Sequence, residues 1–267
     1  MMDNNIINNE ARTRSTDQLI NYLLYLADSN LILAQKNGEW CGHGPVLEQD
    51  IAITNITLDV LGQGRNFYQY AAELMNEAGG HAGQPATEDS LAYLRTERAF
   101  KNLLLCELPK GDWAQSVLRQ FFFSVYAKAL YSQLLNGSDG RIAAIAEKSL
   151  KEVIYHVRWS SEWIIRMGDG TAESHQRLLN ALNYLWPFTG EMFIAADFEK
   201  EMGVDLASIR QEWMQAIQNV FEEATISVPD MNMVMQQGGK QGVHTEHMGF
   251  ILAEMQYLQR TYPGAEW

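Results

Sequence analysis

Apolar side chains recur along this chain at intervals of three or four positions, which is the spacing of one face of an α-helix. From residue 16 onward, the pattern is interrupted only by short segments rich in glycine, proline, asparagine and aspartate. Such segments end one helix and begin the next. No alternation of apolar and polar residues predicts a strand, and the sequence contains no internal repeat. The pattern therefore predicts an all-α fold.

Four of the predicted helices are long. They run from Asp17 to Gly38, from Val46 to Gly79, from Trp113 to Leu135 and from Arg141 to Met167. Asp112 directly precedes the third helix, where its side chain can cap the N-terminus. The second helix has about 33 residues, or roughly 50 Å at 1.5 Å per residue, a length typical of a bundle helix. The connection between the second and third helices carries a further predicted helix, from Asp89 to about Leu105.

Shorter helices are predicted after the fourth long one, from Ser174 to Trp186, from Asp205 to Ala224 and from Thr245 to Thr261. Four long helices with a long connection between the second and third are the ferritin-like arrangement. We therefore expect a ferritin-like four-helix bundle with a long crossover and extra C-terminal helices. Residues 16–267 are expected to form this single helical domain, and residues 1–15, which are polar and rich in asparagine, a disordered tail.

Composition narrows the classes of function. The chain has 267 residues, 46% of them hydrophobic, and a net charge of −13. This acidic balance argues against nucleic acid or an anionic membrane as the main partner. No apolar run approaches the roughly 20 residues that a spanning helix needs. The two cysteines are far apart and form no CxxC motif, which argues against a disulfide framework and a cysteine zinc site. With no apolar stretch of a secretory signal near the N-terminus, we expect a cytoplasmic protein.

A ferritin-like bundle raises the question of a di-iron centre, which needs a Glu-x-x-His motif on two of its helices. None of the six histidines has an acidic residue three positions earlier. The nearest approach is Glu152, where Tyr155 occupies the ligand position and His156 comes one residue late. On the second long helix, Asp59 is followed by Gly62. These residues form either a degenerate metal site or a set of buried polar groups satisfied by hydrogen bonds, and we favour the second. Either interpretation disfavours a self-sufficient di-iron oxygenase.

Two other clusters have a chemical and a structural interpretation. His244, Glu246 and His247 would form a surface metal site, or Thr245 simply caps a helix there, which we favour. The segment from Glu39 to His43 would hold a catalytic Cys-His pair. It is more typical of a helix end with a packed tryptophan, because no third group that would orient such a pair is evident.

A basic stripe and an apolar helix leave further alternatives open. Arg95, Arg98 and Lys101 are spaced three apart in the crossover, where they would contact an anionic ligand such as a nucleotide phosphate or form a solvated face. The helix containing residues 121–130 is apolar almost all round. It is therefore central in this domain or covered by another subunit.

Three blocks of the sequence resemble one known family. The blocks span Glu39–Gln63, Lys151–Thr171 and Gly238–Trp267. They contain EWCGHGP, LEQDIA and LDVLGQ in the first block, KEVIYH and GDGT in the second, and GGKQGVHTE, LAEMQYLQR and PGAEW in the third. They are similar to the C subunit of the bacterial phenylacetyl-CoA 1,2-epoxidase, also called ring-1,2-epoxidase or phenylacetate-CoA oxygenase. The resemblance extends from about Thr16 to Trp267.

The resemblance implies a role in phenylacetate catabolism. The family's enzyme is a multicomponent monooxygenase that adds one oxygen atom of O₂ across the aromatic ring of phenylacetyl-CoA. Its catalytic A subunit holds the di-iron site, and its reductase component uses NADPH, FAD and an iron–sulfur cluster. The C subunit is ferritin-like, has no cofactor of its own and supports the A subunit. The missing Glu-x-x-His motif agrees with such a non-catalytic, structural subunit.

The resemblance also implies contacts with partners and ligand. The expected partners are the catalytic A subunit and the other epoxidase subunits. A contact with phenylacetyl-CoA is expected at Ala99, Phe100, Lys101 and Asn102, where Lys101 would face a phosphate, Phe100 would pack on an apolar part of the ligand and Asn102 would donate a hydrogen bond. Two other functions stay open: an autonomous enzyme or binding protein that uses another site, for example around His244, and an iron-storage protein of the ferritin type.

Overall fold

The computed structural model describes residues 2–79, 85–230 and 233–265, with side chains from residue 15 onward. Within these ranges every regular element is a helix. No helix in this part of the chain combines the length and apolar character required to span a bilayer. The helices and 3₁₀ turns are α1 (Met2–Gly38), α2 (Leu47–Glu77), α3 (Glu88–Tyr93), η1 (Glu97–Ala99), α4 (Leu104–Glu107), α5 (Trp113–Leu134), α6 (Gly140–Gly168), α7 (Ala172–Leu185), η2 (Trp186–Phe188), η3 (Gly190–Phe193), α8 (Asp197–Glu201), α9 (Leu206–Glu223), η4 (Gly239–Gln241), α10 (Glu246–Met255) and α11 (Tyr257–Thr261).

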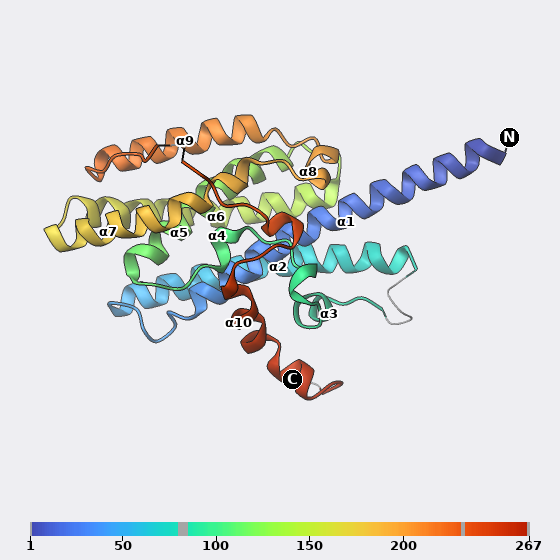
Figure 1. The fold of residues 1–267 in the computed structure, drawn as a ribbon, viewed down its shortest axis with the longest axis horizontal. Coiled ribbons are helices and arrows are strands. Elements are labelled where there is room, and N and C mark those ends of the chain that lie inside the picture. The colour runs from blue at the N-terminus through green and yellow to red at the C-terminus, as the bar shows by residue number, and fades with distance from the viewer. Residues whose placement is uncertain (1, 80–84, 231–232, 266–267) are drawn as a thin grey trace.

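Helices α1, α2, α5 and α6 form the bundle, and the segment between α2 and α5 crosses its length (Figure 1). Side chains pair α1 with α5 and α2 with α6, as in the hydrogen bonds from Asn37 to Gln120 and from Gln63 to Glu152. Helices α7 and α9 pack on the outer side of α5 and α6. This is the ferritin-like all-α fold that the sequence predicts.

Aspartate side chains cap the starts of two of the long helices, α5 and α6. The side chain of Asp112 accepts a hydrogen bond from the backbone N–H of Gln115, as predicted for the start of α5. Asp139 does the same for Arg141 and Ile142 at the start of α6. Each cap satisfies N–H groups that have no partner within the helix.

Helix α5 lies in the centre of the molecule. Its aromatic run is fully enclosed, and Trp213 of α9 donates its indole N–H to the carbonyl of Phe122 at 2.9 Å. The sequence left two explanations for its apolar circumference, a central position in this domain or coverage by another subunit. The structure shows the first. The Glu39–His43 segment is a helix end, where Trp40 packs edge-on to Trp113 at 5.1 Å between ring centroids.

The crossover differs from the prediction of one helix from Asp89 to about Leu105. Helix α3 ends at Tyr93, a 3₁₀ turn follows, and residues 100–103 are extended before α4. The basic residues therefore do not share a helical stripe. Arg95 turns inward to a buried carboxylate, and tertiary contacts of this kind can outweigh a local helical pattern.

The backbone of residues 2–15 belongs to helix α1, which extends beyond the rest of the molecule at its N-terminal end (Figure 1). The sequence assigned this segment to a disordered tail. Lengthening an existing helix requires no new nucleus, so a polar segment continues the helix that the buried half of α1 establishes.

Candidate functional site

The interior of the bundle contains a chain of hydrogen bonds that takes one residue from each of the four long helices. Asn30 of α1 donates to the hydroxyl of Tyr131 of α5 at 3.2 Å. That hydroxyl donates to the amide oxygen of Gln63 of α2 at 3.3 Å, and the Gln63 amide donates to Glu152 of α6 at 2.9 Å. The chain links all four helices through neutral donors and a single carboxylate.

The second polar contact between α2 and α6 is the one that the sequence singled out. The Nε2 atom of His156 lies 3.0 Å from Oδ2 of Asp59. His156 is buried, whereas the neighbouring Tyr155 lies on the surface. Glu152, Asp59 and His156 thus each have a hydrogen-bond partner, as predicted, but of the three only His156 is buried, and Glu152 and Asp59 are half-buried.

These residues do not fit a di-iron centre. Such a centre draws carboxylates from all four helices and a histidine from two of them. Here α1 contributes an amide and α5 a phenol, and α2 contributes an amide and the Asp59 carboxylate, so two of the four helices supply no carboxylate to these contacts. Among the residues that the structure describes, no group of three histidine, cysteine or acidic side chains is arranged to hold a metal ion.

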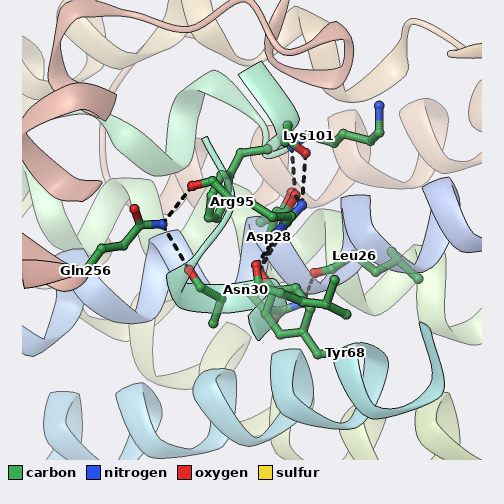
Figure 2. Close-up of polar contacts among 12 residues, drawn as sticks. Leu26, Asp28, Asn30, Tyr68, Arg95, Lys101 and Gln256 are labelled. Atoms are coloured by element: carbon green, nitrogen blue, oxygen red, sulfur yellow. Dashed lines mark hydrogen bonds and ion pairs between the residues drawn. The ribbon is translucent and has the colours of Figure 1, made fainter. Parts of the chain in front are cut away.

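A second polar region lies where the crossover packs on α1 and α2, and Figure 2 shows it. Asp28 of α1 is fully buried and pairs with the guanidinium group of Arg95. It also accepts hydrogen bonds from the hydroxyl of Tyr68 and, at 2.8 Å, from the backbone N–H of Lys101. Arg95 in turn donates to the carbonyl of Ala99 at 2.9 Å. One carboxylate therefore fixes both ends of the segment from 95 to 101.

The C-terminal part of the chain reinforces this segment. The amide of Gln256, at the junction of α10 and α11, donates to the carbonyls of Ala92 and Arg95 at 3.3 and 3.1 Å (Figure 2). Arg260 donates to the same Arg95 carbonyl at 3.1 Å. The crossover is thus held between α1 on one side and the last two helices on the other.

Burial and charge shift the pKa values of this region. Burial raises the pKa of Tyr68, and the neighbouring Asp28 raises it further. Burial lowers the pKa of the Lys101 amine, an effect that Asp28 opposes and Arg95 strengthens. For Arg95, burial favours the neutral form, but Asp28 and Tyr68 outweigh it and the pKa is raised. The Arg95 guanidinium is therefore positively charged across the physiological range.

The four residues predicted to contact a ligand have different environments. Phe100 is fully buried beneath the Arg95 guanidinium, whose central carbon lies 4.2 Å from the ring centroid. Asn102 is also buried and donates to Glu107 at 3.0 Å. Ala99 and Lys101 are half-buried. Phe100 and Asn102 thus fix the segment from inside, and Lys101 is the member of the set with a polar side chain near the surface.

Lys101 lines a hollow of about 310 Å³ next to the N-terminus of α8. The wall opposite comes from α1, α8 and the turn η4; the lining residues are Gln18, Lys101, Ala195, Ala196, Asp197, Phe198, Lys240 and Gln241. The Lys101 amine lies 6.0 Å from the Phe198 ring centroid. The sequence motif did not include these α8 and η4 residues, because they are about 100 positions or more away.

The His244 cluster is an internal ion pair and a helix cap. Nδ1 of His244 lies 2.9 Å from Glu107, and Nε2 lies 3.1 Å from the carbonyl oxygen of Phe100. Thr245 is the N-cap of α10, where its hydroxyl accepts from the backbone N–H of His247. The capping interpretation is confirmed, and His244 is directed into the crossover rather than toward His247.

Sequence reasoning missed two buried charged residues that hold irregular segments of the chain, Asp28 at the crossover and Lys240 near α8. Asp28 is the single charged residue between positions 17 and 36, inside the apolar pattern of α1. Lys240 follows two glycines and forms a buried ion pair with Glu199 at 2.8 Å. A charged residue inside an apolar helical run is a usable signal for such a role, since it must find a partner when buried.

Comparison with known proteins identifies a family. Residues 2–267 match the family model described as phenylacetic acid catabolic protein. A curated relative, the C subunit of the 1,2-phenylacetyl-CoA epoxidase of Escherichia coli (strain K12), is 45% identical over 256 residues, which cover 94% of this chain and 100% of the relative. The all-helical bundle agrees with this match, and the chain belongs to the phenylacetic acid catabolic protein family.

Proposed function

We propose that this chain is a structural, non-catalytic subunit of a multicomponent monooxygenase that epoxidises the aromatic ring of phenylacetyl-CoA. In this proposal it supports a separate catalytic subunit with the di-iron centre, and a reductase component supplies electrons from NADPH. The observation that carries the proposal is the bundle interior, where Asn30, Gln63 and Tyr131 link the helices through amides and a phenol, which do not supply the carboxylates of a di-iron centre. The similarity to the curated C subunit supports the choice of enzyme.

A support role has a thermodynamic meaning. A partner that binds only the folded state of the catalytic subunit raises its apparent stability by mass action. We therefore expect the catalytic subunit to be less soluble and to unfold at a lower temperature when it is produced without this chain.

Iron counting on separated chains tests this proposal. The two subunits are co-expressed and co-purified, then separated, and iron is measured on each by mass spectrometry. The expected result is that iron remains with the catalytic subunit, whereas none is bound stoichiometrically to this chain. Two irons on this chain, or turnover by this chain alone, would overturn the proposal.

We further propose that Lys101 contacts the anionic part of the acyl-CoA at the hollow beside α8. The support is its position on the wall of this hollow, with Phe100 and Asn102 buried behind it. In the reconstituted enzyme, Lys101→Ala is expected to raise KM for phenylacetyl-CoA with little change in kcat. Lys128→Ala, at an exposed position on α5, is the matched control. An unchanged KM for Lys101→Ala would contradict the proposed contact.

The structure gives less support to an autonomous enzyme centred on His244. Both ring nitrogens of His244 already have partners inside the protein. The Nε2 atom of His247 lies 3.9 Å from the carboxylate of Glu246 instead. Substitution of His247 by alanine is therefore expected to leave turnover of the complex unchanged.

A further inference from the structure

The outer face of α2 carries a row of exposed apolar side chains. Leu47, Ile51, Leu58 and Leu61 are 72%, 52%, 61% and 41% exposed, although α2 also buries a full apolar face against α1 and α6. Their spacings of four, seven and three residues follow the 3.5-residue repeat with which one helix packs along another. The helix thus has two apolar faces, and the described part of this chain covers only one of them.

The row continues into a groove. Leu61 lines two adjoining hollows, of about 410 and 180 Å³, that also share Leu31 and Tyr93. One side of the groove is formed by α1 and α2, and the other by α3 and by Met255 at the end of α10. A row of apolar side chains beside such a groove is typical of a surface that receives an amphipathic helix. We call the row and the groove together the α2 surface.

Two ion pairs at the α2 surface neutralise the basic side chains there, one of them between the adjoining Lys36 and Glu39 of the groove wall. Lys36 pairs with Glu39 at 2.6 Å, and Arg65 pairs with Glu88 at 2.8 Å. Each of these basic residues is therefore already neutralised by a neighbour.

The remaining charge at the α2 surface is acidic. Glu48 lies beside the apolar row, and Asp89 and Glu254 line the two hollows. All three are exposed. A second copy of this chain would bring the same carboxylates together, and each copy carries a net charge of −13. An acidic rim instead selects a partner whose apolar face is flanked by lysine or arginine.

We infer that the α2 surface binds an amphipathic helix of a different polypeptide, apolar on one face and flanked by basic side chains. This inference rests on the proposed function, because it takes the catalytic subunit to be the chain that supplies the helix. The apolar row provides the buried contact, and the acidic rim provides the preference for a hetero-partner over a second copy.

The test measures binding of purified full-length chain to the catalytic subunit, with two lysine substitutions compared. Leu58→Lys places a charge in the middle of the row, and we expect binding to weaken by about 30-fold or more, as for a hot-spot residue. Val234→Lys is the matched control, since Val234 is 82% exposed and lies outside the α2 surface. The control is expected to bind like the unmodified chain. Circular dichroism and the melting temperature establish that both variants fold.

The charge component has its own readout. Glu48→Gln combined with Glu254→Gln is expected to weaken binding and to reduce its dependence on salt, because exposed charges are screened by ions. Salt-independent binding of the unmodified chain would overturn the assignment of a basic-flanked helix.

The remaining outcomes separate the two proposals. If the unmodified chain and Leu58→Lys bind the catalytic subunit equally well, the α2 surface is not the binding site, and the proposed function stands. If the unmodified chain shows no binding to the catalytic subunit, both are overturned. If light scattering shows that the chain alone is a dimer that Leu58→Lys converts to a monomer, the occupant is a second copy and the inference of a hetero-partner fails.

Discussion

The bundle interior and the crossover solve the problem of buried polar groups in different ways. In the bundle interior, a phenol and two amides link the four helices, ending at one half-buried carboxylate. In the crossover region, full charges are buried in pairs, such as Asp28 with Arg95. The two regions share one hydrophobic core, so the difference does not come from burial alone.

The backbone explains the difference. Helices satisfy their own N–H and C=O groups, so side chains between them can interact with one another. The crossover and the C-terminal segments are irregular, and their buried N–H groups need acceptors. Carboxylates supply these acceptors: Asp28 accepts from Lys101, Glu191 from Leu104 and Gly238, and Glu107 from Thr245. Buried charge thus occurs where irregular backbone is buried.

The largest effect is expected at Asp28. Asp28→Ala leaves the Arg95 guanidinium and the Lys101 N–H without their acceptor, and breaking a buried pair in this way costs about 3–5 kcal/mol. The free energy of unfolding from urea denaturation measures the loss. Asp28→Asn keeps an acceptor oxygen and should lose less. If Asp28→Ala lowered the free energy of unfolding less than a substitution in the bundle interior does, the comparison between the crossover and the bundle interior would be contradicted.

A smaller effect is expected in the bundle interior. Tyr131→Phe removes the hydroxyl that joins Asn30 to Gln63, and leaving neutral buried groups unpaired costs about 1–3 kcal/mol. Adding Asn30→Leu removes one of the stranded groups, so the double variant should recover part of the loss. Urea denaturation measures these losses. A loss in the double variant that exceeds the sum of the losses in the two single variants would argue against this prediction.

The pH dependence of stability probes the crossover from another side. Burial disfavours the charged form of His244, but the hydrogen bond and charge of Glu107, with smaller contributions from Phe100 and Glu97, outweigh it and raise the pKa above 6.5. The folded state therefore binds the proton more tightly than the unfolded state. This contribution is complete below pH 6.5 and is lost as pH rises through the folded pKa.

Each unit of difference in pKa corresponds to about 1.4 kcal/mol. We expect the urea midpoint of the unmodified chain to decrease as the pH is raised above 6.5. The urea midpoint of His244→Gln should decrease less over the same range. Parallel profiles for the two proteins would mean that His244 does not carry this proton.

The smallest effect is expected at an exposed pair that joins the ends of α2 and α6. Arg141 bonds to Glu73, and both side chains are about half exposed to solvent. Water and salt screen such a pair, so Arg141→Ala should change the melting temperature little. If Arg141→Ala lost as much stability as Asp28→Ala, exposure to solvent would not explain the difference between the exposed and the buried ion pair.

The helices were largely predictable because their signals are local. Apolar periodicity located all four long helices, and Asp112 indicated the start of α5. The missing Glu-x-x-His motif was also evident from the order of residues. Other features depended on contacts between distant residues. Asp28 and Arg95 are 67 positions apart, and their ion pair lies where the helix predicted for the crossover is interrupted.

The fold class, the family resemblance and the lack of the di-iron motif all follow from neighbouring residues, since periodicity and motifs are local properties of the chain. The choice of which apolar residues face the core does not. Ile56 and Leu58 belong to the same helical pattern, yet Ile56 is buried against this chain and Leu58 is exposed. A helix can be apolar on two faces, and the packing of the other helices selects the one that this chain covers.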